Sequence, residues 1–305
     1  MKTLSRHDFN KARTYLKTQA RPLERRLFAF YFENEPMENT VADLAQFQND
    51  DGGFGNAIEP DFRMPESSPM ATNYGLQIAW EIAAPSSQPT IANAIKYILT
   101  CYDSRSGTWP MVSSEVNNHP HAPWWQFDAA KGKVSAESTG NPTAQIVRSL
   151  LAWPEMLPAG LLDTLTSLCL ERIADLTGEV SMHELICYTE FVEALPTELR
   201  GDSENKIKAL VSKTVARDPS AWSSYSPQPL VFVNSPESFL YADLGQVVEA
   251  NLDYLIDIQD PSGCWMPNWD WGASYPEVWD VARQEWQGVI TLNNLRKLQT
   301  FGRLV

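Results

Sequence analysis

Basic residues are scarce in this sequence. Its 305 residues include 24 Lys and Arg against 38 Asp and Glu, which gives a formal net charge of −14. A surface of that sign repels a phosphate backbone or an anionic membrane unless basic residues gather locally. The one such gathering lies between Arg21 and Arg26. We therefore expect no nucleic acid partner and no binding to a membrane surface.

Long apolar runs are also missing. The first residues contain no apolar segment of the signal-peptide kind, and no uncharged run approaches the length that spans a bilayer. Cysteines are few, widely spaced and without a Cys-x-x-Cys pair, which is typical of isolated reduced thiols rather than a disulfide framework or a thiolate zinc site. The four are Cys101, Cys169, Cys187 and Cys264. These features predict a cytoplasmic protein without an integral membrane segment.

Strand signals are nearly absent, because the segment 229–233 is the only short β-branched run. Apolar residues instead recur at helical spacing over much of the chain. Ser5 followed by Asp8 resembles a capping box, and the helix it begins should end before Pro22. Hydrophobic residues make up 43% of the chain, which is enough to bury a full core. The sequence predicts an all-α protein with long loops.

Two loops share one pattern, in which a helix ends in glutamine and a glycine and an aromatic residue follow. The first is "QNDDGGFGNAIEPDF" from Gln48, and the second is "DIQDPSGCWMPNWDWG" from Asp257. The pattern consists of Gln48, Gly52, Gly53, Phe54, Gln259, Gly263 and Trp265. Weaker copies surround Trp109 and Trp222, so a repeat of about 50 residues and five or six helical hairpins are expected.

This pattern resembles the repeat motif of the terpenoid cyclase and protein prenyltransferase superfamily, that is, squalene-cyclase-like repeats. The resemblance implies a single α/α toroid domain over residues 1–305. In that superfamily the glutamine and the aromatic residue tie an inner helix end to the next repeat, and the glycines permit the tight backbone. The first loop is therefore interpreted mainly as a structural turn, with a positive φ expected in its glycine pair.

The acidic and zinc signatures of the superfamily are missing. No Asp-x-Asp-Asp run occurs, Asp-Asp-x-x-Asp is broken after Asp50 and Asp51, and no Asp-x-Cys pair is present. The close pair His119 and His121 flanks a proline in a loop, and we expect no metal and no other cofactor there.

The remaining candidates for chemistry are carboxyl groups near aromatic residues. Asp61 is the predicted general acid, Glu59 the neighbour that shifts its pKa, and Asp270 the alternative acid. Aromatic walls desolvate a carboxyl group and stabilise developing positive charge. The predicted substrate-binding residues are His121, Trp124, Trp125, Asp128, Trp269 and Trp271. Because both loops carry more aromatic surface than a solvated loop tolerates, we expect "PHAPWW" and "PNWDWG" to meet at one mouth of the toroid.

Three functions stay open at this point. The first is acid-initiated cyclisation or transfer on an isoprenoid or other apolar ligand in a central aromatic cavity. The second is a carbohydrate-active α/α-barrel enzyme (a hydrolase, lyase or epimerase), since tryptophan faces also stack on sugar rings. The third is a toroid that binds a small-molecule ligand without turnover. A closed apolar cavity favours the first, an open polar cleft the second, and acids engaged in caps or ion pairs the third.

Overall fold

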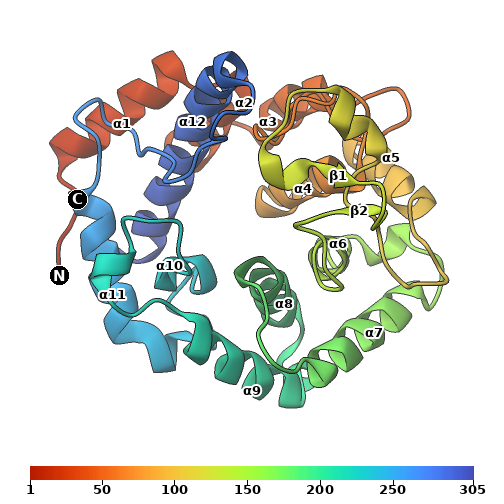
Figure 1. The fold of residues 1–305 in the computed structure, drawn as a ribbon. Helices are drawn as coiled ribbons and strands as arrows, with labels where there is room; N and C mark the ends of the chain where they lie inside the picture. The colour runs from red at the N-terminus through yellow and green to blue at the C-terminus, as the bar shows by residue number, and fades with distance from the viewer. The chain divides into compact units, whose positions relative to one another are not determined.

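The computed structural model describes residues 1–305 and consists mostly of helices (Figure 1). The α-helices are α1 Arg6–Gln19, α2 Pro22–Glu33, α3 Met37–Leu44, α4 Pro69–Glu81, α5 Pro89–Thr100, α6 Thr143–Leu150, α7 Leu161–Asp175, α8 Met182–Ala194, α9 Thr197–Thr214, α10 Pro229–Phe232, α11 Tyr241–Asp257 and α12 Pro276–Thr300. Short 3₁₀-helices cover Ala45–Phe47, Ser114–Asn118, Pro123–Trp125, Pro154–Met156 and Pro219–Ala221. The prediction of a helical protein is confirmed.

Helix starts follow local capping chemistry. The Ser5 hydroxyl accepts a hydrogen bond from the Asp8 backbone N–H at 3.1 Å and so begins α1, as the sequence predicts. Ser68 and Ser181 cap α4 and α8 in the same way. Pro22 occupies the first turn of α2, where its missing N–H costs no hydrogen bond.

The chain forms two compact units. The first unit contains Met1–Asp43 and Val211–Val305, and the second contains Leu44–Leu210. In the first unit α1, α2 and α12 pack against one another and α10 packs on α11; in the second, α6 packs on α4, α7 and α8, and α4 also packs on α5. The expectation of one toroidal domain stays a prediction.

The β-branched run at 229–233 is helical over Pro229–Phe232, and Val233 is the extended residue that ends the helix. Pro229 begins α10, and Leu230 and Phe232 are buried where α10 packs on α11. The Leu230 backbone N–H donates to Asn251 Oδ1 on α11 at 3.2 Å. A side chain thus accepts the hydrogen bond that a neighbouring strand would accept in a sheet. The one sheet is a hairpin of two short strands, each of two residues, which the sequence did not predict. It pairs β1 Phe127–Asp128 antiparallel with β2 Lys133–Val134.

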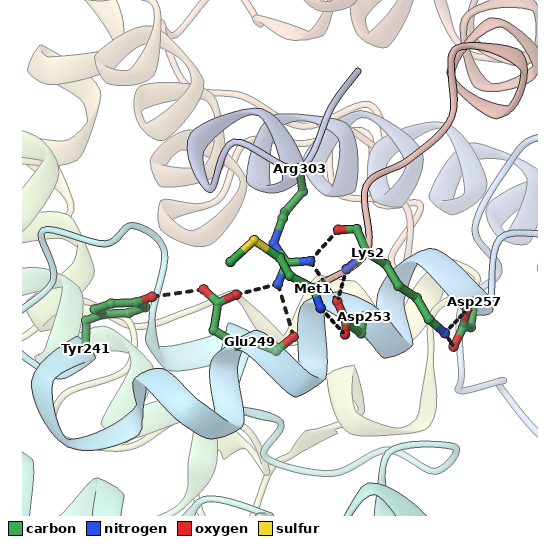
Figure 2. Close-up of polar contacts among 7 residues, drawn as sticks. All are labelled: Met1, Lys2, Tyr241, Glu249, Asp253, Asp257 and Arg303. Carbon is green, nitrogen blue, oxygen red and sulfur yellow. Dashed lines mark hydrogen bonds and ion pairs between the residues drawn. The ribbon is translucent and has the colours of Figure 1, made fainter.

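A charged cluster holds both chain ends against α11 (Figure 2). Arg303 is 1% exposed, and its guanidinium pairs with Glu249 and, at 2.7 Å, with Asp253. The same guanidinium donates to the Lys2 carbonyl, while the Lys2 ammonium pairs with Asp257. Residues far apart in sequence are thereby fixed to one helix.

No helix combines the length and the apolar character that crossing a membrane requires.

Candidate functional site

The two glutamines of the repeated pattern make the same pair of hydrogen bonds. Gln48 Nε2 donates to the Gly52 carbonyl and to the Thr90 carbonyl, both at 2.8 Å. Gln259 Nε2 donates to the Gly263 carbonyl at 2.9 Å and to the Asp8 carbonyl at 3.1 Å. Thr90 lies in the first turn of α5, and Asp8 lies in the first turn of α1. Each glutamine therefore closes its own turn and joins that turn to a second helix.

The glycines of the turns press against those helices. Gly52 has φ +89°, which confirms the positive φ expected in the first glycine pair, and Gly263 in the second turn has φ +98°. A Cβ on Gly52 would lie 2.8 Å from the Asn93 carbonyl oxygen, and a Cβ on Gly263 would lie 2.4 Å from the Lys11 carbonyl carbon. Gly53 has no positive φ, but a Cβ there would lie 2.5 Å from that of Ser67.

A buried threonine on a later helix completes the turn, and the sequence analysis missed it. Phe54 N–H donates to Thr72 Oγ1 at 2.9 Å, and Trp265 N–H donates to Thr291 Oγ1 at 3.0 Å. In the weaker copy, Trp109 N–H donates to Thr143 Oγ1 at 3.4 Å. The threonines follow their aromatic residues by 18, 26 and 34 positions. Because this spacing varies, no fixed motif could have found them; only the recurrence of threonine at buried helix positions gives a signal.

The two acids after the first turn are buried. Asp61 is 3% exposed and Glu59 is 8% exposed. The Asp61 backbone N–H donates to Glu59 Oε2 at 2.7 Å, so the Glu59 carboxylate braces the backbone that carries Asp61. This pair is placed as a candidate site requires, away from bulk water and on a constrained loop.

Backbone pairing brings Asp61 to the loop of His121 and Trp125. Ala122 N–H donates to the Asp61 carbonyl at 2.7 Å, and Arg63 N–H donates to the Pro120 carbonyl at 2.8 Å. Between these two bonds, the ring centroids of Phe62 and Trp125 lie 5.3 Å apart. Residues that are about 60 positions apart in sequence thus form one buried acidic and aromatic group in the second unit.

The two histidines of this loop contact different partners. His121 is buried, with Nδ1 2.6 Å from the His119 carbonyl oxygen and Nε2 3.1 Å from Gln126 Oε1. His119 Nε2 lies 3.4 Å from a Glu66 carboxylate oxygen. No group of three or more His, Cys, Asp or Glu side chains in the structure is arranged to hold a metal ion.

Trp124 and Asp128 contact residues of the β1–β2 hairpin segment. Trp124 is half-buried, and its carbonyl accepts a hydrogen bond from Ser135 at 3.3 Å. Asp128 sits at the start of the β1–β2 turn, where its carboxylate accepts the Ala130 N–H at 2.9 Å and pairs with Lys131 at 3.0 Å. The hydrogen bond from Lys131 is the main reason that the pKa of Asp128 is lowered. Asp128 therefore serves the hairpin turn.

The second aromatic loop belongs to the first unit. Trp271 is buried against Trp279, with ring centroids 5.6 Å apart, and Trp269 lies edge-on to Trp286 at 5.2 Å. Asp270 is exposed, and its carboxylate accepts the Gly272 N–H at 2.8 Å. The tryptophans beside Asp270 in sequence therefore do not desolvate its carboxyl group. Since the two aromatic loops lie in different units, their meeting at one mouth stays a prediction.

Comparison of the sequence with protein-family models and with curated proteins finds no match. Among solved structures, the type II terpene cyclase MstE from Scytonema is similar with a TM-score of 0.53 at 15% identity, over 94% of this chain and 88% of that chain. The fold is similar to that of a terpenoid cyclase. The resemblance is thereby confirmed as a likeness of fold, and at this identity the chemistry has to be argued from the residues themselves.

Proposed function

We propose that this protein binds an apolar, isoprenoid-like ligand and starts its cyclisation by proton transfer from Asp61. One observation carries the proposal: a carboxyl residue that is 3% exposed lies on a loop lined by Phe62 and Trp125, in a fold similar to a type II terpene cyclase. That similarity supports the class of ligand, and the residues of this chain support the choice of acid.

Burial suits a proton donor. A carboxyl group taken out of water favours its neutral form, and a second carboxyl group two residues away disfavours a second negative charge. Asp61 and Glu59 are both buried and lie two residues apart in sequence. Phe62 and Trp125 are buried aromatic rings with centroids 5.3 Å apart, and an aromatic face in contact with the ligand would stabilise a developing cation.

The proposed step is a general-acid addition. The Asp61 carboxylic acid gives its proton to a ligand alkene, whose π electrons form the new C–H bond, and a tertiary carbocation and the Asp61 carboxylate result. A second alkene of the ligand attacks the cation and closes a ring. Loss of a proton from the last cation restores a neutral product, and Asp61 regains a proton from solvent.

The test begins with binding of farnesol and geranylgeraniol, followed by tryptophan fluorescence, and with a search for cyclised isomers of the same mass by gas chromatography and mass spectrometry. Asp61→Asn should abolish turnover while leaving probe affinity and melting temperature nearly unchanged. Asp163→Asn, at an exposed carboxyl on α7 of the same unit, is the matched control and should keep full activity. Full activity in Asp61→Asn, or binding of neither probe, would refute the proposal.

The second candidate is a ligand-binding protein without turnover. It is favoured by the use of Glu59 to brace the Asp61 backbone at 2.7 Å, since an acid engaged in this way has a structural role. This function predicts that the probes bind and are recovered unchanged, in the wild type as in Asp61→Asn.

A further inference from the structure

A polar cleft lies in the first unit, between α1, α12 and the second repeat turn. Its volume is about 650 Å³, and Thr14, Thr18 and Gln19 line it from α1. Arg283, Gln284 and Gln287 line it from α12. The spacing of each set places its side chains on one helix face, so the cleft has two facing walls of hydroxyl, amide and guanidinium groups.

Several polar atoms of these walls have hydrogen-bonding positions that no protein group occupies. Gln284 Nε2 donates to the Gln19 backbone carbonyl at 3.3 Å, whereas the side-chain carbonyl oxygens of Gln284 and Gln19 accept no hydrogen bond from the protein. Arg283 uses one of its nitrogens for Asp280 at 3.0 Å, and its other N–H groups have no protein partner. The cleft thus presents acceptors and donors side by side.

The charge of the cleft is balanced. Arg283 and Asp280 are its only charged side chains, and they pair with each other. Tyr15 forms part of the floor and donates to Gln287 Oε1. Burial, followed by the nearby Cys264 thiol, raises the pKa of Tyr15 to about 12, so its hydroxyl stays protonated at neutral pH. A neutral ligand that both donates and accepts hydrogen bonds fits such a surface better than an ion does.

An apolar contact is available next to these groups. Gln287 Nε2 donates to Met266 Sδ at 3.2 Å, and Met266 is 44% exposed. A thioether beside amides can cover the C–H face of a ligand whose hydroxyl groups reach the two walls.

We propose that this cleft binds a neutral polyhydroxylated molecule, a sugar or polyol of mono- to disaccharide size. A volume of about 650 Å³ lies within the range of small-molecule sites, and hydroxyl groups match mixed donors and acceptors. The cleft is formed by residues of the first unit, whereas Asp61 belongs to the second unit.

The test uses glucose, maltose and cellobiose as probes, with saturation-transfer NMR to detect binding and titration calorimetry to measure affinity. Gln284→Met keeps the side-chain length but removes the amide, whereas Arg283→Gln shortens the side chain and removes the guanidinium with its charge; each should weaken binding about three- to tenfold. Gln299→Met, at an exposed amide near the other end of α12, is the matched control and should bind as the wild type does. Thermal unfolding of each variant checks that it is folded.

Two outcomes would overturn the inference: no saturable binding of any probe up to 20 mM, or equal affinities in the wild type and in both cleft variants. The Asp61→Asn variant should bind the same sugar with unchanged affinity. A loss of sugar binding in this variant would show that the sugar site depends on Asp61 and would contradict a site formed by the first unit alone. Failure of farnesol binding leaves this result intact, so the two proposals fail independently.

Discussion

The repeat turns give the sharpest stability prediction. In Gly263→Ala the new Cβ would lie 2.4 Å from the Lys11 carbonyl carbon and 2.6 Å from its oxygen. These atoms belong to the backbone of α1 and cannot turn aside as a flexible side chain could. The residue also sits at φ +98°, which L-residues rarely adopt.

The cost follows from these two effects. Backbone strain of this kind is worth about 1–3 kcal/mol, and overpacking against a fixed neighbour adds about 1–3 kcal/mol, so Gly263→Ala should destabilise by roughly 2–6 kcal/mol. Gly272 provides the control in the same loop, since it has φ +58° with nothing within 4 Å of an added Cβ. Gly272→Ala should cost only about 1–2 kcal/mol.

Urea unfolding measures the difference, with far-UV circular dichroism and tryptophan fluorescence as two probes. For a slope of about 3 kcal/mol/M, a 3 kcal/mol difference separates the two midpoints by about 1 M. Equal midpoints for Gly263→Ala and Gly272→Ala would show that α1 moves away at little cost, and would refute the reasoning from close packing.

Two more predictions concern buried polar groups. Thr291→Val leaves the Trp265 N–H without its acceptor and should destabilise by about 1–3 kcal/mol, whereas Thr300→Val at an exposed position should have little effect in the same urea assay. Arg303→Met removes the guanidinium from Glu249 and Asp253 and leaves Asp253 with only the Met1 ammonium as a cation, at 3.7 Å; because these carboxylates are about a third exposed, the cost should be about 1–3 kcal/mol. Burial acts to raise the pKa of Asp253, but hydrogen bonds from Lys2 and Arg303 outweigh it and lower this pKa below 3.8. The stability that the ionised Asp253 contributes is therefore present above pH 3.8 and is lost as the pH falls below it. The melting temperatures of wild type and Arg303→Met should therefore differ most above about pH 4 and converge towards pH 2; a constant difference would contradict the role given to Asp253.

The sequence by itself determined the local features. Ser5 predicts the start of α1 because an N-cap needs only its own hydroxyl and an N–H three residues on. Gly52 and Gly263 predict their turns because a positive φ is a property of one residue. The recurrence of glutamine, glycine and an aromatic residue was enough to indicate the superfamily fold, since each copy closes its turn within a few residues.

Only the tertiary structure decided what depends on distant partners. The threonines that receive the Phe54, Trp109 and Trp265 N–H groups come from later helices at variable spacing. Asp61 meets the His121 loop through backbone hydrogen bonds, which carry no side-chain signature.

Asp61 and Asp270 have similar aromatic neighbours in sequence, yet Asp61 is buried and Asp270 is exposed. The sequence shows which side chains lie next to each acid along the chain, but the burial of the acid depends on which other segments of the fold cover it. For this chain, the sequence named Asp61 ahead of Asp270, whereas the difference in burial between them is set by the packing of one loop against another.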